Sequence, residues 1–162
     1  MRRFLAGGLV AGIMLTMAFA APAAQAGPAA QSTTCTMKAT VNFDPGLNYS
    51  QEKTVVIRAH GKLTGCNGGG VLSAKFKGRG GGTISCTSGV ATIKLKNTWN
   101  TTETSIISLK ADLGSQSLSG TVKKGKFAGE DVTATNVTFT PVDGDCITVP
   151  LTKAAITATV SL

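Results

Sequence analysis

Residues 35–43 read CTMKATVNF, and the alternation of apolar and polar side chains in this stretch decides the predicted fold. Successive side chains of a β-strand point to opposite faces, so a period of two predicts a strand with one buried face. The predicted inward residues are Cys35, Met37, Ala39, Val41 and Phe43. Asp44-Pro45-Gly46 follows directly and is typical of a turn.

The same period of two continues along the chain. Residues 55–63 (VVIRAHGKL), 72–79 (LSAKFKGR) and 91–96 (ATIKLK) repeat it, and we predict further strands at 103–111, 117–123, 131–140, 147–152 and 154–162. Gly80-Gly81-Gly82 is predicted to form the flexible end of a hairpin, before a short segment at 83–86. The apolar parity switches between Ala134 and Val137, which predicts a β-bulge or a strand that moves between sheets.

The composition is that of a folded β-protein. The 162 residues are 42% hydrophobic, 15% charged and 5% aromatic, which excludes a disordered chain and disfavours a helical bundle. Many short strands without a helix are typical of a sandwich or a small barrel. We predict an all-β fold, an antiparallel β-sandwich of immunoglobulin-like or jelly-roll-like layout, as a single domain over residues 27–162.

The first 26 residues are predicted to be an export signal. Arg2 and Arg3 precede an apolar run at 4–21, and Ala24-Gln25-Ala26 matches the pattern of a cleavage site. The alternative is an uncleaved anchor helix, because the run approaches the length that crosses a bilayer. No later stretch is long and apolar enough for a membrane span, so a secreted, extracellular protein is expected after cleavage.

The four cysteines all lie in the predicted exported part. An even number outside the cell indicates two disulfides, and the spacings of 31, 20 and 60 residues are unlike the close pairs of zinc sites. Four cysteines allow three pairings. We favour Cys35–Cys66 with Cys86–Cys146, because antiparallel pairing of the first two strands brings Cys35 near Cys66.

Residues that could carry catalysis are few. His60 is predicted to point outward between two cations, and the G-x-S-x-G motif of a serine nucleophile is absent. The only acidic clusters are Glu130-Asp131 and Asp143-Gly144-Asp145, and turn chemistry explains the second without a metal. We therefore predict no enzyme activity, no cofactor and no metal. The remaining catalytic alternative is a secreted hydrolase that uses a pair of these acids.

The placement of the cations is the most informative functional signal. The formal net charge is +8, and +6 remains when Arg2 and Arg3 are removed with the signal. Positions predicted to face outward carry most of the cations in the first half of the domain. The candidate binding residues are Arg58, Lys62, Lys75, Lys77, Arg79, Lys94 and Lys96, with Lys38 beside them. If the strands that carry them belong to one sheet, these cations would form a cationic outer face that concentrates polyanions.

Short motifs across the mature chain resemble small secreted β-sheet proteins of actinobacteria that have no assigned function. The similar motifs are Cys35-Thr36, Pro45-Gly46-Leu47, Leu63-Thr64-Gly65-Cys66, Ser85-Cys86, Trp99-Asn100, Phe127-Ala128-Gly129 and Asp145-Cys146. The resemblance implies a secreted sandwich with two disulfides, and it carries over no catalytic residue.

The sequence thus favours a secreted, non-catalytic binding or interaction module of the cell surface or extracellular space. The expected partners are anionic polymers or cell-envelope components, and no specific nucleic acid is predicted because recognition usually adds stacking aromatics, for which Tyr49 and Trp99 are the candidates. A passive envelope or structural protein is the alternative, since outward Lys residues also prevent pairing at sheet edges and maintain solubility.

Overall fold

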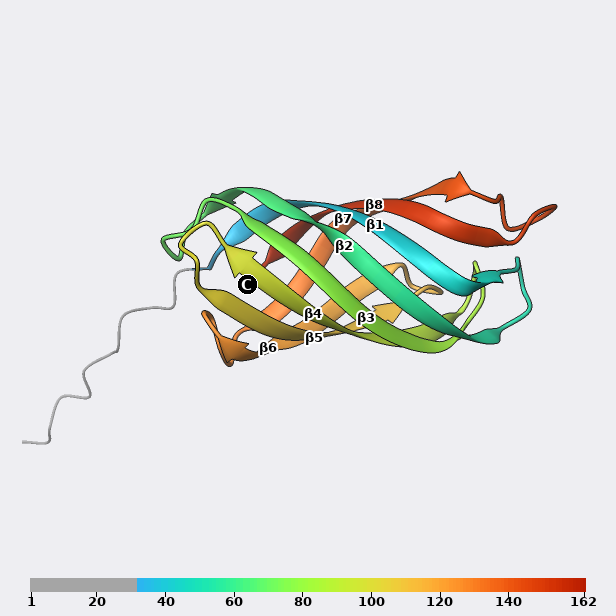
Figure 1. Ribbon diagram of the computed structural model, residues 1–162, viewed down its shortest axis with the longest axis horizontal. Helices are drawn as coiled ribbons and strands as arrows, with labels where there is room; N and C mark the ends of the chain where they lie inside the picture. Colours follow the sequence, from blue (N-terminus) through green and yellow to red (C-terminus); the bar gives the residue numbers. More distant parts are fainter. Residues whose placement is uncertain (1–31) are drawn as a thin grey trace, which may run out of the picture.

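The computed structural model describes residues 32–162, which form a single all-β unit (Figure 1). The predicted export signal at residues 1–26 lies outside the described residues. Eight strands follow one another along residues 32–162. Their bounds are β1 (Thr34–Leu47), β2 (Lys53–Asn67), β3 (Ala74–Ile84), β4 (Gly89–Trp99), β5 (Thr104–Asp112), β6 (Ser117–Gly125), β7 (Asp131–Asp143) and β8 (Leu151–Ser161).

The strands close into an antiparallel barrel in which each strand pairs with its neighbours in sequence, and β8 pairs with β1. The predicted all-β class is therefore confirmed, but the predicted β-sandwich is wrong. The ladder from Thr34–Ser161 to Asn42–Lys153 joins the first strand to the last and leaves no open sheet edge, whereas both sheets of a sandwich would keep theirs. Alternation alone could not distinguish the two folds, because both bury one face of every strand.

The inward side chains fill the barrel, and the predicted inward face of β1 is largely correct. Met37, Val41 and Phe43 are buried, as are Ile57 and Leu63 of β2. The same period continues in β4, where every second residue from Ala91 to Trp99 is buried. The prediction of two separate strands at 147–152 and 154–162 was wrong. Residues 147–150 are a connection, and β8 is a single strand from Leu151.

We call the end of the barrel that holds Thr33 and Leu162 the near end and the opposite end the far end (Figure 1). A buried polar contact closes the near end. The Trp99 indole Nε1 donates to Ser105 Oγ at 2.8 Å, and that hydroxyl donates to the carbonyl of Lys126 at 2.6 Å. Phe127 packs edge-on against Trp99 with ring centroids 5.2 Å apart.

Both predicted disulfides are present. Cys35–Cys66 joins β1 to β2 at the near end, and Cys86–Cys146 joins the β3–β4 turn to the β7–β8 connection at the far end. Disulfides of this kind persist in oxidising surroundings, and they are consistent with an extracellular setting. Residues 32–162 contain no helix of the length and apolarity that a membrane crossing needs.

The glycine-rich part of β3 is not the hairpin end that the sequence predicted. Strand β3 runs through Gly78, Gly80 and Gly82 to Ile84, paired with β2 on one side and β4 on the other. A Cβ atom built on Gly80 would overlap the carbonyl oxygen of Thr92 on β4. The glycines therefore allow β3 and β4 to approach closely where the sheet curves into the barrel.

We expect Gly80→Ala to lower the free energy of unfolding by about 2–3 kcal/mol, because the added methyl group forces β3 away from β4. Chemical denaturation of the oxidised protein measures the change. Gly114→Ala is the matched control, since a Cβ there meets nothing closer than 3.4 Å and its stability should stay unchanged. Equal stability of both variants would show that the close approach is not required.

Candidate functional site

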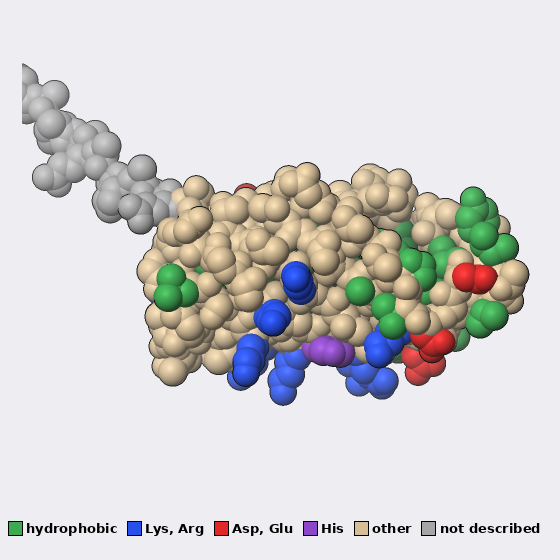
Figure 2. Space-filling model, turned by 90° about the horizontal axis from the view of Figure 1, so that it is seen from above, with side chains coloured by type: hydrophobic (Ala, Val, Ile, Leu, Met, Phe, Trp, Pro, Cys, Tyr) green, Lys and Arg blue, Asp and Glu red, His purple; other side chains and the backbone are tan. Residues whose placement is uncertain are grey.

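The outer surface of β1–β4 brings all the predicted binding residues together on one side of the barrel. We define the cationic face as the eight exposed cations of these strands, namely Lys38, Arg58, Lys62, Lys75, Lys77, Arg79, Lys94 and Lys96. Figure 2 shows the blue side chains along one side of the molecule, with the purple His60 among them. Alternation within each strand gives this placement, because the intervening residues are the ones that fill the barrel.

The register of the ladders aligns these cations in rows across the strands. One row runs Lys38–Lys62–Lys75, from β1 to β3. The next contains His60, Lys77 and Lys96, from β2 to β4. The third row is Arg58–Arg79–Lys94. Rows lie two residues apart along the strands, or roughly 7 Å, and neighbouring strands lie roughly 5 Å apart, so the face is compact.

Five directly opposed pairs on this face carry like charges: Lys38–Lys62, Lys62–Lys75, Lys77–Lys96, Arg58–Arg79 and Arg79–Lys94. Like charges directly opposite one another on neighbouring strands destabilise a sheet. No ladder partner of these eight cations is acidic within the described residues. The one ion pair of residues 32–162, between Lys126 and Glu103 at 2.8 Å, lies elsewhere. The repulsion on the face is therefore not relieved by neighbouring side chains.

Closure of the barrel removes one of the simpler explanations for these cations. Outward Lys residues often protect an exposed sheet edge from pairing with another chain. Strands β1–β4 each pair on both sides, so none of them is an edge in the part of the chain that the structure describes. Solubility remains as an explanation, but a soluble surface normally mixes both signs of charge rather than setting like charges opposite one another.

Neither aromatic candidate for stacking lies on the cationic face. Trp99 is 2% exposed and is held at the near end by its contact with Ser105, so it cannot stack on a base from solution. Tyr49 is exposed but belongs to the β1–β2 loop at the far end. The face thus offers charge without a stacking platform, which suits recognition of a charged backbone more than recognition of bases.

The two acidic clusters lie at opposite ends of β7. Glu130 and Asp131 lie at the start of the strand, and Asp143 and Asp145 lie at or beyond its other end. A strand of 13 residues is roughly 40 Å long, far more than the separation of the two carboxylates of a glycoside hydrolase. The clusters therefore cannot combine into one acid pair.

The Asp145 carboxylate organises the β7–β8 connection. Its Oδ1 accepts hydrogen bonds from the backbone N–H groups of Ile147, Thr148 and Val149 at 2.8–2.9 Å, and the Thr148 hydroxyl donates to Oδ2. These bonds, the Thr148 hydroxyl first among them, hold the pKa of Asp145 well below its usual range. Asp143 similarly accepts from the Thr152 hydroxyl at 2.6 Å. Both carboxylates thus have a structural role, and residues 32–162 hold no cluster of metal-ligating side chains.

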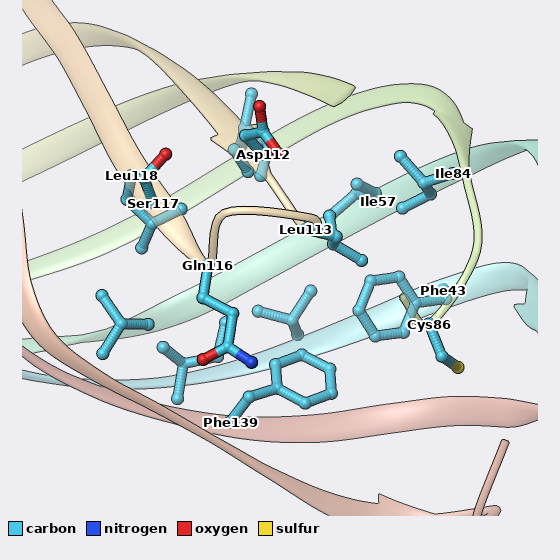
Figure 3. Close-up of a pocket in the computed structure, with 15 residues that line it drawn as sticks. Phe43, Ile57, Ile84, Cys86, Asp112, Leu113, Gln116, Ser117, Leu118 and Phe139 are labelled. Carbon is cyan, nitrogen blue, oxygen red and sulfur yellow. The ribbon is translucent and has the colours of Figure 1, made fainter. Parts of the chain in front are cut away.

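The structure also contains a cavity that the sequence did not predict. The far end of the barrel encloses an apolar cavity of about 120 Å³ (Figure 3). Its walls come from all eight strands, so no single motif marks it in the sequence. The one available signal was the switch of apolar parity after Ala134, which turns Val137 and Phe139 toward the cavity.

Comparison of the chain with protein-family models, with curated proteins and with solved structures finds no match. Function must therefore be inferred from the residues and their arrangement.

Proposed function

We propose that this protein is exported and acts outside the cell as a non-catalytic binding module, whose cationic face holds an anionic polymer of the envelope or its surroundings. The observation that carries the proposal is the set of opposed like-charge pairs on β1–β4. They destabilise the free barrel, and a bound polyanion would relieve that repulsion. Charge placed at a cost to the fold is typical of a functional surface.

The chemistry of the face favours a flexible polymer with closely spaced negative charges. The rows offer Lys ammonium groups, which act as point charges, together with Arg58 and Arg79, whose guanidinium groups bind phosphate or carboxylate oxygens in pairs. All these side chains are exposed, and they stand on strands that pair on both sides. Such a face attracts polyanions at long range and reads charge density rather than sequence.

We expect the affinity for inorganic polyphosphate to fall steeply with salt. If about six charges are neutralised, the slope of log K against log salt is about −4, and the affinity drops by more than 100-fold between 50 and 200 mM salt. Fluorescence anisotropy of labelled polyphosphate with the oxidised protein measures this slope. Neutral dextran of similar length is the control and should not bind. A slope shallower than −1, or equal binding of dextran, would contradict the proposal and favour a passive envelope protein.

A further inference from the structure

The cavity at the far end lies inside the barrel and has a wall that is almost entirely apolar. Figure 3 shows Phe43, Ile57, Ile84 and Leu113 directed toward a common space, with Phe139 on its lower side. The rings of Phe43 and Phe139 are 6.3 Å apart between centroids. A void of this kind is unusual because protein interiors pack at the density of organic crystals and rarely leave space larger than a water molecule.

The cavity exists because two neighbouring strands separate toward the far end. Pairing between β6 and β7 covers only Leu118–Ala134 to Thr121–Asp131, so the second half of β7 pairs with β8 alone. A β-bulge between Thr135 and Thr138 then reverses the parity of β7, as the sequence predicted, and turns Val137 and Phe139 inward. Strand β7 thereby forms one side of the cavity without closing against β6.

The cavity reaches the surface between β7 and the β5–β6 connection. Gln116, Ser117 and Phe139 line it and are exposed, so they mark the mouth (Figure 3). Phe139 is 38% exposed, so an apolar side chain of the lining reaches the surface at the mouth. A molecule from solution can therefore enter without unfolding the barrel.

A buried polar atom without a hydrogen-bond partner lies in the half of the barrel toward the near end. A smaller cavity of about 30 Å³ shares the side chain of Leu118 as a wall and is lined by Asn97. Asn97 is 2% exposed, and its Oδ1 accepts no hydrogen bond from the described residues. A buried acceptor without a partner is costly unless something donates to it. Asn97 lines this smaller cavity and not the far-end cavity, so it does not determine the ligand of the far-end cavity.

The residues that line the far-end cavity determine which charge a ligand can carry. It contains no Lys, Arg or His, so an anion would find no partner there. The single ionisable group in it is Asp112, whose Oδ1 accepts the Ser115 N–H at 3.1 Å, and this hydrogen bond lowers the pKa of the carboxyl so that it stays ionised. That negative charge at the rim repels carboxylates and phosphates. Gln116 and Ser117 offer neutral hydrogen-bonding groups at the mouth.

We propose that the far-end cavity binds a small uncharged apolar molecule, about the size of benzene or of a six-carbon alkyl chain, through its mouth between β7 and the β5–β6 connection. The size follows from the volume, because a cavity of roughly 150 Å³ lined by Leu, Ile and Phe stays dry and binds benzene. This site is separate from the cationic face, since its ligand is uncharged and enclosed in the barrel.

Methyl-resolved NMR titration tests the proposal with benzene, 1-hexanol and hexanoate as probes. We expect saturable shifts from benzene and 1-hexanol at the lining methyls of Ile57, Ile93 and Ile156, and no shift at near-end methyls. Hexanoate should bind at least 10-fold more weakly than 1-hexanol, because it carries a negative charge toward Asp112.

A variant that fills the cavity provides a second test of the proposal. Ala111 is buried and lines the cavity, so Ala111→Leu places three more carbon atoms in it and should weaken benzene binding at least 10-fold. Ala155→Leu is the matched control, because Ala155 lies outside the lining on β8, and it should bind like the wild type. Unsaturable shifts, shifts spread over the whole protein, or unchanged binding by a folded Ala111→Leu variant would overturn the proposal.

Discussion

We expect the triple variant Lys75→Glu, Lys77→Glu and Lys94→Glu to bind polyphosphate at least 100-fold more weakly than the wild type at low salt. Each cation near an anionic surface contributes about 1 kcal/mol, and 1.4 kcal/mol corresponds to a factor of ten. Each reversal removes two units of charge, so the formal charge of the eight-cation face falls from +8 to +2. Repulsion by the new carboxylates adds to the loss.

The same variant should be at least as stable as the wild type, and this distinguishes lost binding from lost folding. Glu at position 75 would stand opposite Lys62, Glu at 77 opposite Lys96, and Glu at 94 opposite Arg79. Three repulsive arrangements thus become attractive ones, and opposite charges across strands stabilise a sheet. Thermal unfolding at low salt should show an equal or higher midpoint, with the difference shrinking as salt is added.

A control of equal charge tests the position of the cations as opposed to their number. Lys110→Glu, Lys123→Glu and Lys124→Glu change the net charge by the same amount, but these residues lie on β5 and β6. All three are exposed, so their reversal should leave the fold intact. We expect this variant to keep most of the affinity for polyphosphate. If both triple variants lose binding equally, then net charge and not the cationic face is responsible.

The strand pattern could be predicted from the sequence because it depends on local alternation. Lys75 and Phe76 must face opposite sides of any sheet, whatever its global shape. The pairing of Cys35 with Cys66 could be predicted for the same reason, since two strands joined by a short loop pair antiparallel. The seven predicted binding residues share one side of the molecule because adjacent strands present them in the same rows.

Closure of the barrel could not be predicted, because it depends on contacts that alternation does not encode. Thr34 and Ser161 are opposite each other at the seam, yet they lie at the two ends of the described chain. The clue to closure in the sequence was that glycine occupies several inward positions of β3. A run of three glycines is typical of a hairpin end, whereas Gly80 sits where the strand must curve against Thr92. The cavity could not be predicted either, because its walls are ordinary core residues until the bulge of β7 leaves a space between them.

The disulfide Cys86–Cys146 should make a large contribution to the stability of the barrel. It ties the β3–β4 turn to the β7–β8 connection across the far end. The β3–β4 turn is itself held to the β1–β2 loop, since Cys86 N–H donates to the Asn48 carbonyl and the Thr87 hydroxyl donates to the Tyr49 carbonyl, both at 2.9 Å. The crosslink therefore anchors the one part of β7 that lacks a partner on its β6 side.

We expect the variant Cys86→Ser with Cys146→Ser to lose about 4 kcal/mol of unfolding free energy, because the bond closes a loop across a sequence separation of 60 residues. For a domain of this size the melting midpoint should fall by more than about 10 °C. Hydrogen exchange should locate the effect. The amides of Thr138, Phe139, Thr140, Val142 and Asp143 on β7 should lose protection more than those of β4, because the second half of β7 opens from the barrel first.

Removal of the other disulfide, by Cys35→Ser with Cys66→Ser, provides the comparison. The chain-entropy loss is similar, about 3–4 kcal/mol for a separation of 31 residues. Its two cysteines, however, lie on strands that are already paired along most of their length, at the end far from Phe139. This variant should lose stability without selective exposure of β7. If both variants instead lower protection uniformly, then the far-end crosslink constrains only the unfolded chain, and β7 is held in place by its ladder with β8 and the apolar contacts of Val137 and Phe139.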